Sequence, residues 1–162
     1  MTPSPSATIG CRAATGDDVA RLGELAAAAV AELRAGRGGE VWALHHARQP
    51  PLEASLARDV ADPEQLVVCG LLDDTVLGYA ACHTEPLPDG TLLGVLTELY
   101  TEPAAREVGL GEAMMEHVLA WCGAQGCRGV DSLALPGDRH TKNFFESFGL
   151  VARAILVHRP IR

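Results

Sequence analysis

The segment whose residue types most clearly suggest ligand binding is Arg106–Gly111, which reads REVGLG. A basic residue is followed by two glycines, and the helix-like stretch Glu112–Trp121 begins directly after them. Glycine lets a ligand approach the backbone closely, and the first turn of a helix presents N–H groups that have no intrahelical acceptor. These features predict an anion cradle, and the expected guest is the polyphosphate of a nucleotide or of coenzyme A.

Two other phosphate-binding patterns fit this segment less well. A P-loop needs a lysine after its second glycine, and the only lysine of the chain is Lys142. A dinucleotide-binding loop needs a third glycine, and this chain has Met114 at that position. The glycines of a dinucleotide-binding loop also follow the first strand directly. Here the loop 101–108 intervenes, and Asp131, which stands at the spacing of a ribose-binding carboxylate, lies inside an apolar run. Both patterns are therefore disfavoured.

A third pattern, R/Q-x-x-G-x-G/A between a strand and a helix, matches the segment. It resembles the acetyl-CoA loop of the GNAT superfamily of N-acetyltransferases. Residues 8–18 resemble the first strand and turn of that family, and residues 99–103 resemble the end of its fourth strand. The run FFESFGL at 144–150 resembles its x-Y-E-x-x-G-F segment, with one difference. Because these segments occur in the family's order within one domain length, the chain is identified as a member.

The resemblance implies an α/β (α+β mixed) fold, with a central, mostly antiparallel mixed sheet of six to seven strands and about four flanking helices. It places a flexible tail at 1–7 and a single domain at 8–162. In this family two neighbouring strands part, and the thioester of acetyl-CoA lies in the gap. Backbone groups near 99–101 would bind the pantetheine arm, and residues 108–112 the pyrophosphate. The predicted cofactor-binding residues are Leu99, Tyr100, Thr101, Arg106, Glu107, Val108, Gly109, Leu110, Gly111, Glu112, Asn143 and Phe145.

Glu98 is the predicted catalytic base. It precedes Leu99 and Tyr100 on the strand next to the expected reaction centre, and its apolar neighbours would bury it in part. Partial burial favours the neutral form of a carboxylic acid and so suits a general base. The alternative is a solvent-facing strand residue that alternates with Tyr100. Arg106 is likewise either a charge-assisted donor to a phosphate or a solvated surface arginine.

Phe145 is the residue where this chain departs from the family. Many members have a tyrosine there, whose hydroxyl is placed to protonate the coenzyme A sulfur, and a phenyl ring cannot donate. The only tyrosines, Tyr79 and Tyr100, are far from it in sequence. The loss need not abolish activity, because a thiolate with a pKa near 8.5 is a fair leaving group. Asn143, His140 or a water molecule could substitute, and the sequence does not choose among them.

The acceptor site is expected in the irregular region Arg37–Arg58. Its candidate substrate-binding residues are Glu40, Trp42 and His45. The adjacent His45 and His46 could bind a metal, but no carboxylate or third histidine stands at helical spacing from them. A pocket wall or a plain helix surface is the better interpretation, and no metal is predicted.

Composition limits the remaining function classes. The net charge of −8 argues against nucleic acid, which needs a basic face. No apolar run approaches the roughly 18 residues of a membrane span, and the N-terminal residues do not resemble a secretory signal. The protein is therefore expected in the cytoplasm with its five cysteines as free thiols, and Cys122 and Cys127 lack the partners of a zinc site.

The expected elements follow from hydrophobic spacing and turn residues. Strands are predicted at 9–13, 66–72, 76–83, 92–100, 130–135 and 151–158. Helices are predicted from the capping residue Thr15 to about Arg34, at 52–61, after the cradle, and at 138–148. Gly36, Gly38 and Gly39 are expected to end the first helix.

The sequence is interpreted as an acetyl-CoA-dependent N-acetyltransferase that moves an acetyl group directly to a primary amine in a ternary complex. The first alternative is a catalytically impaired protein that binds acetyl-CoA as a sensor or interaction module, and Phe145 is its best support. The second is a partner-binding domain without a ligand, which Gly109 and Gly111 disfavour. The predicted partners are a small-molecule or peptide amine and, as an open alternative, a second copy in a homodimer.

Overall fold

The computed structural model describes residues 6–161. Most of the tail predicted at 1–7 therefore lies outside the described residues. The strands are β1 (Ile9–Ala13), β2 (Gln65–Leu72), β3 (Thr75–Pro86), β4 (Leu92–Thr101) and β5 (Cys127–Ser132), and the helices are α1 (Val19–Arg34), α2 (Gly39–His45), α3 (Leu52–Ala61), α4 (Leu110–Ala124) and α5 (Arg139–Ser147). Two short 3₁₀ turns lie at Gly16–Asp18 and Pro103–Ala105.

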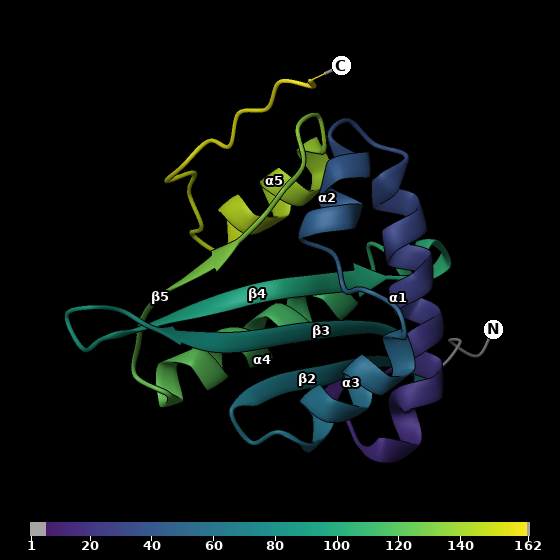
Figure 1. Cartoon of the computed structure of the whole chain (residues 1–162). Helices are drawn as coiled ribbons and strands as arrows, with labels where there is room; N and C mark the ends of the chain where they lie inside the picture. The colour runs from purple at the N-terminus through teal and green to yellow at the C-terminus, as the bar shows by residue number, and fades with distance from the viewer. Residues whose placement is uncertain (1–5, 162) are drawn as a thin grey trace.

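The five strands form one sheet in the order β1-β2-β3-β4-β5 (Figure 1). The first four pair in antiparallel fashion, and β5 lies parallel to β4 at one edge. Helix α4 connects β4 to β5, as a parallel pair requires a crossover. The sheet is thus mixed and mostly antiparallel, which is the predicted fold class.

Strand alternation divides the core between the two faces of the sheet. Val68, Ala80 and Cys82 face α4 and α5, where they pack with Met114 and Phe145. Their chain neighbours point the other way, toward α1 and α3, and this second cluster consists of Leu22, Leu25, Ala26, Leu56, Val67, Cys69, Tyr79 and Ala81. Period-two burial on both faces explains why β2 and β3 read as nearly continuous apolar runs.

A β-bulge in β4 lies next to the cleft described below. Glu98 pairs with Ala81 and Leu96 pairs with Cys82, so Thr97 has no partner on β3. The Thr97 hydroxyl donates to the Ala81 carbonyl at 3.1 Å and satisfies that acceptor. Bulges bend a strand and change the direction of its side chains. After this bulge, Glu98 and Tyr100 lie on the α1 side of the sheet and Leu99 packs against the α4 side.

Several predicted elements are confirmed. The strand 9–13, the end of the first helix at Arg34 and the helix 52–61 have the predicted bounds. The capping box between Thr15 and Asp18 is present. The turn between β2 and β3 is made by Asp73 and Asp74, whose φ angles of 49° and 64° are those of a tight hairpin turn.

Other predictions were wrong. Among residues 6–161 the sheet has five strands, not six to seven, and there are five α-helices where about four were predicted. The extra helix is α2, because Gly39 both follows the end of α1 and begins a new helix. A Cβ atom on Gly39 would lie 2.1 Å from the Leu33 carbonyl oxygen, so only glycine lets α2 start this close to α1.

The strand predicted at 151–158 is absent, because residues 151–161 run past α5 without a neighbouring strand to bond (Figure 1). The strand predicted at 130–135 instead spans Cys127–Ser132, where β4 offers backbone partners. All five cysteines are free thiols. No helix within residues 6–161 has the length and apolar character needed to cross a membrane.

Candidate active site

A cleft of about 600 Å³ opens where β4 extends beyond β5. Its walls come from α1, α2, the residues after α2, the end of β4, the loop before α4, and α5 with the loop that precedes it. This volume is in the range of small-molecule and cofactor sites. Among the predicted site residues, the cleft is lined by Trp42, Glu98, Leu99, Tyr100, Thr101, Arg106, Glu107, Gly111, Glu112 and Phe145.

The parting of β4 from β5 leaves one edge of β4 free. Their last pairing joins Leu96 to Ser132, whose hydroxyl donates to the Leu96 carbonyl at 3.0 Å. Residues 98–101 of β4 continue with β3 as their sheet partner on the other side. A free strand edge presents N–H and C=O groups to any extended ligand. An amide-containing arm such as pantetheine could therefore bond to this edge, in the gap that the family resemblance implies.

The cradle predicted at 106–112 has the backbone geometry that an anion site requires. Glu107 and Gly109 have φ angles of 65° and 104°, and Gly109 is the N-cap of α4. The N–H groups of residues 107–112 have no acceptor within residues 6–161, and the first intrahelical bond at this end runs from Ala113 to the Gly109 carbonyl. Unpaired N–H groups at a helix start favour a phosphate. The residues present therefore fit the pyrophosphate of coenzyme A.

Gly111 has a packing role that the sequence did not indicate. A Cβ atom at this position would lie 3.3 Å from the Phe144 ring, so glycine lets α5 pack against the first turn of α4. The residues that line the cleft do not include Val108, Gly109 or Leu110. Leu110 lies in the core and is 1% exposed. Their predicted contribution to cofactor binding rests on backbone groups alone.

Arg106 is fixed by its own protein contacts. Its guanidinium donates to the Thr101 carbonyl at 2.9 Å and to Glu32 of α1 at 2.8 Å, and it lies 5.5 Å from the centre of the Tyr100 ring. The Glu32 carboxylate raises the pKa of the Arg106 guanidinium. Arg106 thus ties the cradle to α1, and phosphate contact by this side chain remains a prediction.

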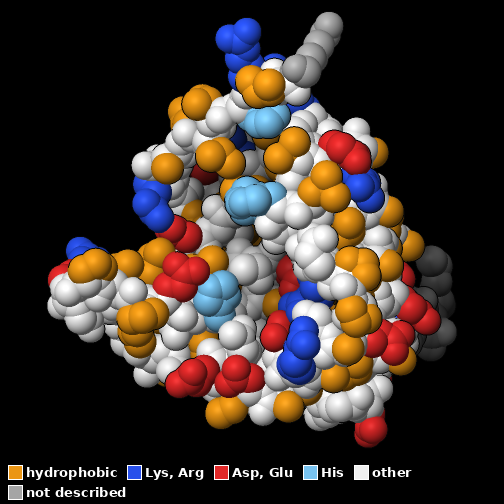
Figure 2. Space-filling model, viewed as in Figure 1, with side chains coloured by type: hydrophobic (Ala, Val, Ile, Leu, Met, Phe, Trp, Pro, Cys, Tyr) orange, Lys and Arg blue, Asp and Glu red, His pale blue; other side chains and the backbone are white. Residues whose placement is uncertain are grey.

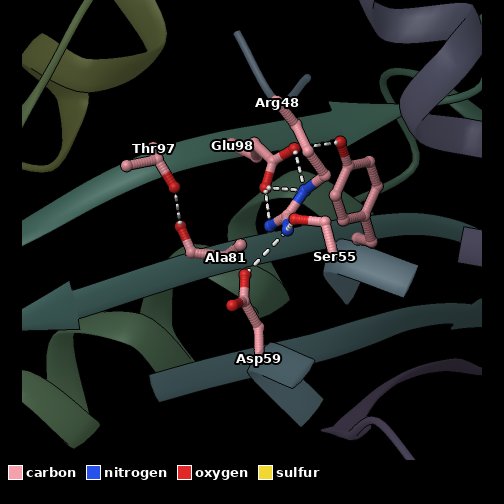
Figure 3. A network of polar contacts seen from close by, with 7 residues as sticks. Arg48, Ser55, Asp59, Ala81, Thr97 and Glu98 are labelled. Atoms are coloured by element: carbon pink, nitrogen blue, oxygen red, sulfur yellow. Dashed lines mark hydrogen bonds and ion pairs between the residues drawn. The ribbon is translucent and has the colours of Figure 1, made fainter. Parts of the chain in front are cut away.

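Glu98 is the centre of a polar network that connects four segments of the chain (Figure 3). Its carboxylate accepts from Arg48 Nη2 at 2.5 Å, from Arg48 Nε at 3.0 Å and from the Tyr79 hydroxyl at 3.1 Å. Arg48 also donates to Ser55 at 2.7 Å and pairs with Asp59 at 2.8 Å. The side chains of Arg48 and Glu98 are only 8% and 14% exposed.

This network changes the interpretation of Glu98. The neighbours of Glu98 in the chain are apolar, whereas in the structure the Arg48 guanidinium lies directly against its carboxylate. A carboxylate offers about four lone-pair positions, and Arg48 and Tyr79 occupy most of them. These three donors leave about one lone-pair position of Glu98 for a further partner.

Two tyrosines also lie at the cleft. Tyr79 and Tyr100 are cross-strand partners on β3 and β4, and both line the cleft wall. Burial, and then the neighbouring Glu98 carboxylate, hold the pKa of Tyr79 well above its usual range. Burial, followed by the charge of Glu32, raises the pKa of Tyr100. Both phenols therefore keep their protons near neutral pH. Tyr100 was predicted as a cofactor-binding residue, whereas Tyr79 was missed because it is remote in sequence from the predicted motifs.

Phe145 is mostly buried and belongs to both the core and the cleft. It is 8% exposed, and its ring lies 5.9 Å from that of Phe144. His140 lines the cleft from the same helix, whereas Asn143 is exposed and lies outside it. The tyrosine position of the family therefore does face the cleft, but it presents a phenyl ring.

Only one of the three predicted acceptor-binding residues lies at the cleft. Trp42 lines the cleft. Glu40 points to solvent, where it pairs with Arg34, and His45 is exposed beside His46. Within residues 6–161 no group of three or more histidine, cysteine, aspartate or glutamate side chains is arranged to hold a metal ion.

Residues missed by the sequence analysis come mainly from α1 and from the loop between β5 and α5. They line the cleft but belong to no motif: Ala29, Val30, Glu32, Leu33, Ser132, Leu133, Leu135 and Asp138. The amphipathic pattern of α1 could have suggested a helix packed on the sheet, but not which of its residues reach a cleft.

Cys11, which is half-buried, and Cys69, which is buried, are not activated thiols. Burial raises the pKa of Cys11 to about 11 and that of Cys69 to about 12. A thiol acts as a nucleophile through its thiolate, which such pKa values suppress.

The sequence profile of the acetyltransferase (GNAT) family matches residues 27–150, and the chain belongs to this family. No curated protein matches the sequence significantly. Among solved structures, a transcriptional regulator from Bacillus halodurans C-125 is similar, with 15% identity, coverage of 95% of this chain and 100% of that one, and a TM-score of 0.71. An acetyltransferase from Trypanosoma brucei has 16% identity, coverage of 95% and 100%, and a TM-score of 0.67.

The aminoglycoside N-acetyltransferase AAC(6')-Iy, solved in complex with CoA, has 14% identity to this chain. The similarity covers 100% of this chain and 99% of that one, with a TM-score of 0.73. At these identities the structures show a common fold, and the chemistry has to be argued from the site.

Proposed function

We propose that this protein is an acetyl-CoA-dependent N-acetyltransferase that transfers an acetyl group directly to a primary amine in a ternary complex. The observation that carries the proposal is the continuity of the cleft. Glu107, Gly111 and Glu112 line one part of it and belong to the segment whose N–H groups have no acceptor. The free edge of β4 runs along it, and Glu98 lies just beyond the last pairing of β4 with β5. The predicted phosphate site would thus be continuous with a free strand edge and a carboxylate.

Bound acetyl-CoA would supply an activated thioester, and the protein would position it. The N–H groups of the cradle would hold the pyrophosphate, and the edge at 99–101 would hold the pantetheine arm. Glu98 would bind the acceptor amine and act as its general base. Its charge attracts an ammonium ion, and its oxygens can take up the proton that the amine must lose. Arg48 and Tyr79 hold that carboxylate in place. The raised thiol pKa values favour direct transfer over an acetyl-cysteine.

The charged residues that line the cleft indicate the kind of acceptor that it would bind. The cleft is lined by Glu32, Glu98, Glu107, Glu112 and Asp138, with Arg48 and Arg106 as the arginines among them. On the face shown in Figure 2, acidic and basic side chains are interspersed, and no single basic patch forms. A cationic or neutral amine, either a small molecule or a peptide, suits this cleft better than an anionic acceptor.

The experiment is an assay of free thiol release from acetyl-CoA with a panel of amines, peptides and aminoglycosides, and mass spectrometry of the acceptor. Thiol release should require an acceptor and should match acetylated product. Glu98→Gln should lower the rate by roughly 10²–10⁴-fold while acetyl-CoA affinity changes less than about twofold. Glu85→Gln, an exposed carboxylate on β3 outside the cleft, is the matched control and should keep the full rate. An equal rate in both variants would remove Glu98 from the chemistry.

One alternative has specific support. Phe145 cannot donate a proton, and the Glu98 carboxylate is engaged by Arg48 and Tyr79. These two features suit a protein that binds acetyl-CoA as a sensor or interaction module. Calorimetric binding of acetyl-CoA, without thiol release for any acceptor in the panel, would favour this alternative over the enzyme.

A further inference from the structure

The apolar stripe of α1 continues beyond the core and into the cleft. Leu22, Leu25 and Ala26 pack in the core cluster on the α1 side of the sheet. Val30 and Leu33 follow at helical spacing, belong to neither core cluster and line the cleft. Both side chains are only partly exposed. The last part of α1 therefore presents its apolar side chains to the cleft instead of to the core.

Trp42 adds an aromatic wall from α2. It is partly exposed, belongs to neither core cluster and lines the cleft. α2 starts directly against the end of α1, because Gly39 comes so close to the Leu33 carbonyl oxygen that a Cβ atom would clash with it (Figure 1). The two helices thus place Val30, Leu33 and Trp42 around one part of the cleft, and these three residues are called the helical wall below.

The helical wall lies on the side of β4 that is opposite to α4. Leu99 packs on the α4 side, and the proposed pyrophosphate site is the start of α4 itself. Tyr100 packs on the α1 side, where the Glu98 carboxylate accepts from the Tyr79 hydroxyl. Because the proposed cofactor contacts lie at the β4 edge and at α4, the apolar surface of α1 and α2 is available to the other reactant, the acceptor.

The charged groups on this side complement a single ammonium ion. Arg48 is shared by two carboxylates, since it donates to Glu98 and also pairs with Asp59 at 2.8 Å (Figure 3). Two carboxylates around one guanidinium leave one negative charge in excess. Glu32, the carboxylate that α1 contributes to the cleft, has its own cation in Arg106 at 2.8 Å. A second ammonium group of an acceptor would therefore compete with Arg106 for its partner.

The helical wall offers few hydrogen-bonding groups. The side chains of Val30 and Leu33 have none, and Trp42 contributes one indole N–H. An acceptor with many hydroxyl groups would give up water at this wall and leave most of those groups without a partner, which costs free energy. A hydrocarbon body gains free energy on the same transfer out of water.

We propose that the acceptor is an apolar monoamine, in which one primary amino group is carried on an aliphatic or aromatic hydrocarbon body. The nitrogen lies at Glu98 and the body packs against the helical wall. This inference rests on the proposed function, because it names the substrate class of the same cleft. The neutral amine attacks the thioester carbonyl, so that a C–N bond forms and the C–S bond breaks. The amine proton passes to Glu98, and coenzyme A leaves as the thiolate.

The experiment uses matched amines with acetyl-CoA. Ethylamine, butylamine and hexylamine differ only in chain length, and 1,6-diaminohexane has the length of hexylamine with a second amino group. A buried methylene contributes about 0.8 kcal/mol, so kcat/KM from thiol release should rise about fourfold with each added methylene. Hexylamine should exceed 1,6-diaminohexane by about tenfold or more, because the second ammonium would be desolvated at an apolar wall.

Two substitutions test the helical wall itself. Leu33→Asp should reverse the preference between hexylamine and 1,6-diaminohexane, because it places a carboxylate where the far end of the acceptor lies. Trp42→Ala should lower kcat/KM for hexylamine by about tenfold or more and flatten the chain-length series. Leu44→Ala is the matched control on α2, since Leu44 is 66% exposed and lies outside the cleft, and it should keep the full series. Circular dichroism checks that each variant is folded.

Binding of the same amines to the complex with coenzyme A, measured by calorimetry, separates this inference from the proposed function. Tighter binding of hexylamine than of 1,6-diaminohexane, without thiol release for any amine, would refute acetyl transfer and support the apolar site. Thiol release that is fastest with 1,6-diaminohexane or with an aminoglycoside would support transfer and overturn the apolar acceptor. Rates and affinities that stay constant along the series, or a series unchanged by both substitutions, would overturn it as well.

Discussion

Arg48 and Glu98 are fifty residues apart in the chain and form a bidentate ion pair in which the side chains are 8% and 14% exposed. Arg48 follows α2 and reaches β4, so this contact joins the expected acceptor region to the strand beside the cofactor gap. A buried pair is expensive to break, because removing one partner leaves the other charge without compensation. The pair therefore fixes the position of Glu98.

The first prediction concerns this ion pair. Arg48→Met should destabilise the protein by about 3–5 kcal/mol, because the Glu98 carboxylate would stay buried without its cation. Adding Glu98→Leu should recover part of that loss. Urea unfolding of the single and double variants measures the coupling. Arg34→Met, which breaks the exposed pair with Glu40, is the control and should cost far less stability, because solvent screens that pair. Equal losses at Arg48 and Arg34 would contradict the prediction.

The second prediction concerns the cradle. Gly111→Val should weaken acetyl-CoA binding by about tenfold or more, because its side chain would occupy the space above the first turn of α4. The substitution also presses on Phe144, so the same change is made in a Phe144→Leu background. Calorimetric titration should find the same loss in both backgrounds. Full recovery with Phe144→Leu would mean that Gly111 serves packing alone.

A matched glycine on the same helix controls for this change. A Cβ atom added to Gly123 of α4 would meet no neighbouring atom within 4 Å, so Gly123→Ala should leave acetyl-CoA affinity unchanged. It should stabilise the protein by about 0.5–1 kcal/mol, since alanine favours a helix interior over glycine.

The third prediction concerns the missing hydroxyl. If protonation of the coenzyme A sulfur is not the main barrier, Phe145→Tyr should change the rate of acetyl transfer by less than about tenfold. If it is the main barrier, a general acid at this position should raise that rate by roughly 10²–10⁴-fold. Phe148→Tyr, just after α5 and outside the cleft, is the control. Thiol release is measured for both. New turnover in Phe145→Tyr, from a wild-type protein with none, would instead identify a degenerate acetyltransferase.

The fourth prediction concerns acid stability at the start of α1. The Arg12 guanidinium, and then the Thr15 N–H, hold the pKa of Asp18 well below its usual range. Because the folded pKa lies below the unfolded value of about 3.9, ionised Asp18 stabilises the protein above that pH, and the contribution is lost as the pH falls further.

Asp18→Asn should therefore lower the free energy of unfolding at pH 7 by about 1.5–3 kcal/mol, the contribution of a hydrogen bond to a charged group. The difference from the wild-type protein should shrink as the pH falls below about 4. Urea unfolding at a series of pH values measures both effects. Asp17→Asn changes the exposed neighbour and should follow the wild-type curve. A constant difference across this pH range would contradict the assignment.

Much of the fold was predictable because its signals are local. The glycines of the cradle, the capping box at Thr15 and the turn at Asp73 each act within a few residues, and each lies where it was predicted. The hydrophobic periods of α1 and α3 defined their bounds in the same way. The family resemblance added the parting of β4 and β5, which no local pattern indicates.

The remainder was decided by contacts between distant segments. Whether 151–158 forms a strand depends on a partner for its backbone, which is a tertiary fact that its apolar alternation cannot supply. Likewise, the neighbours of Glu98 in the chain are apolar, whereas Arg48 and Tyr79 reach it only after α2 and β3 are in place. The sequence alone therefore determined most of the local elements and the glycine-bearing turn before α4. The charge environment of the site depends on distances between atoms, and only the folded chain sets those distances.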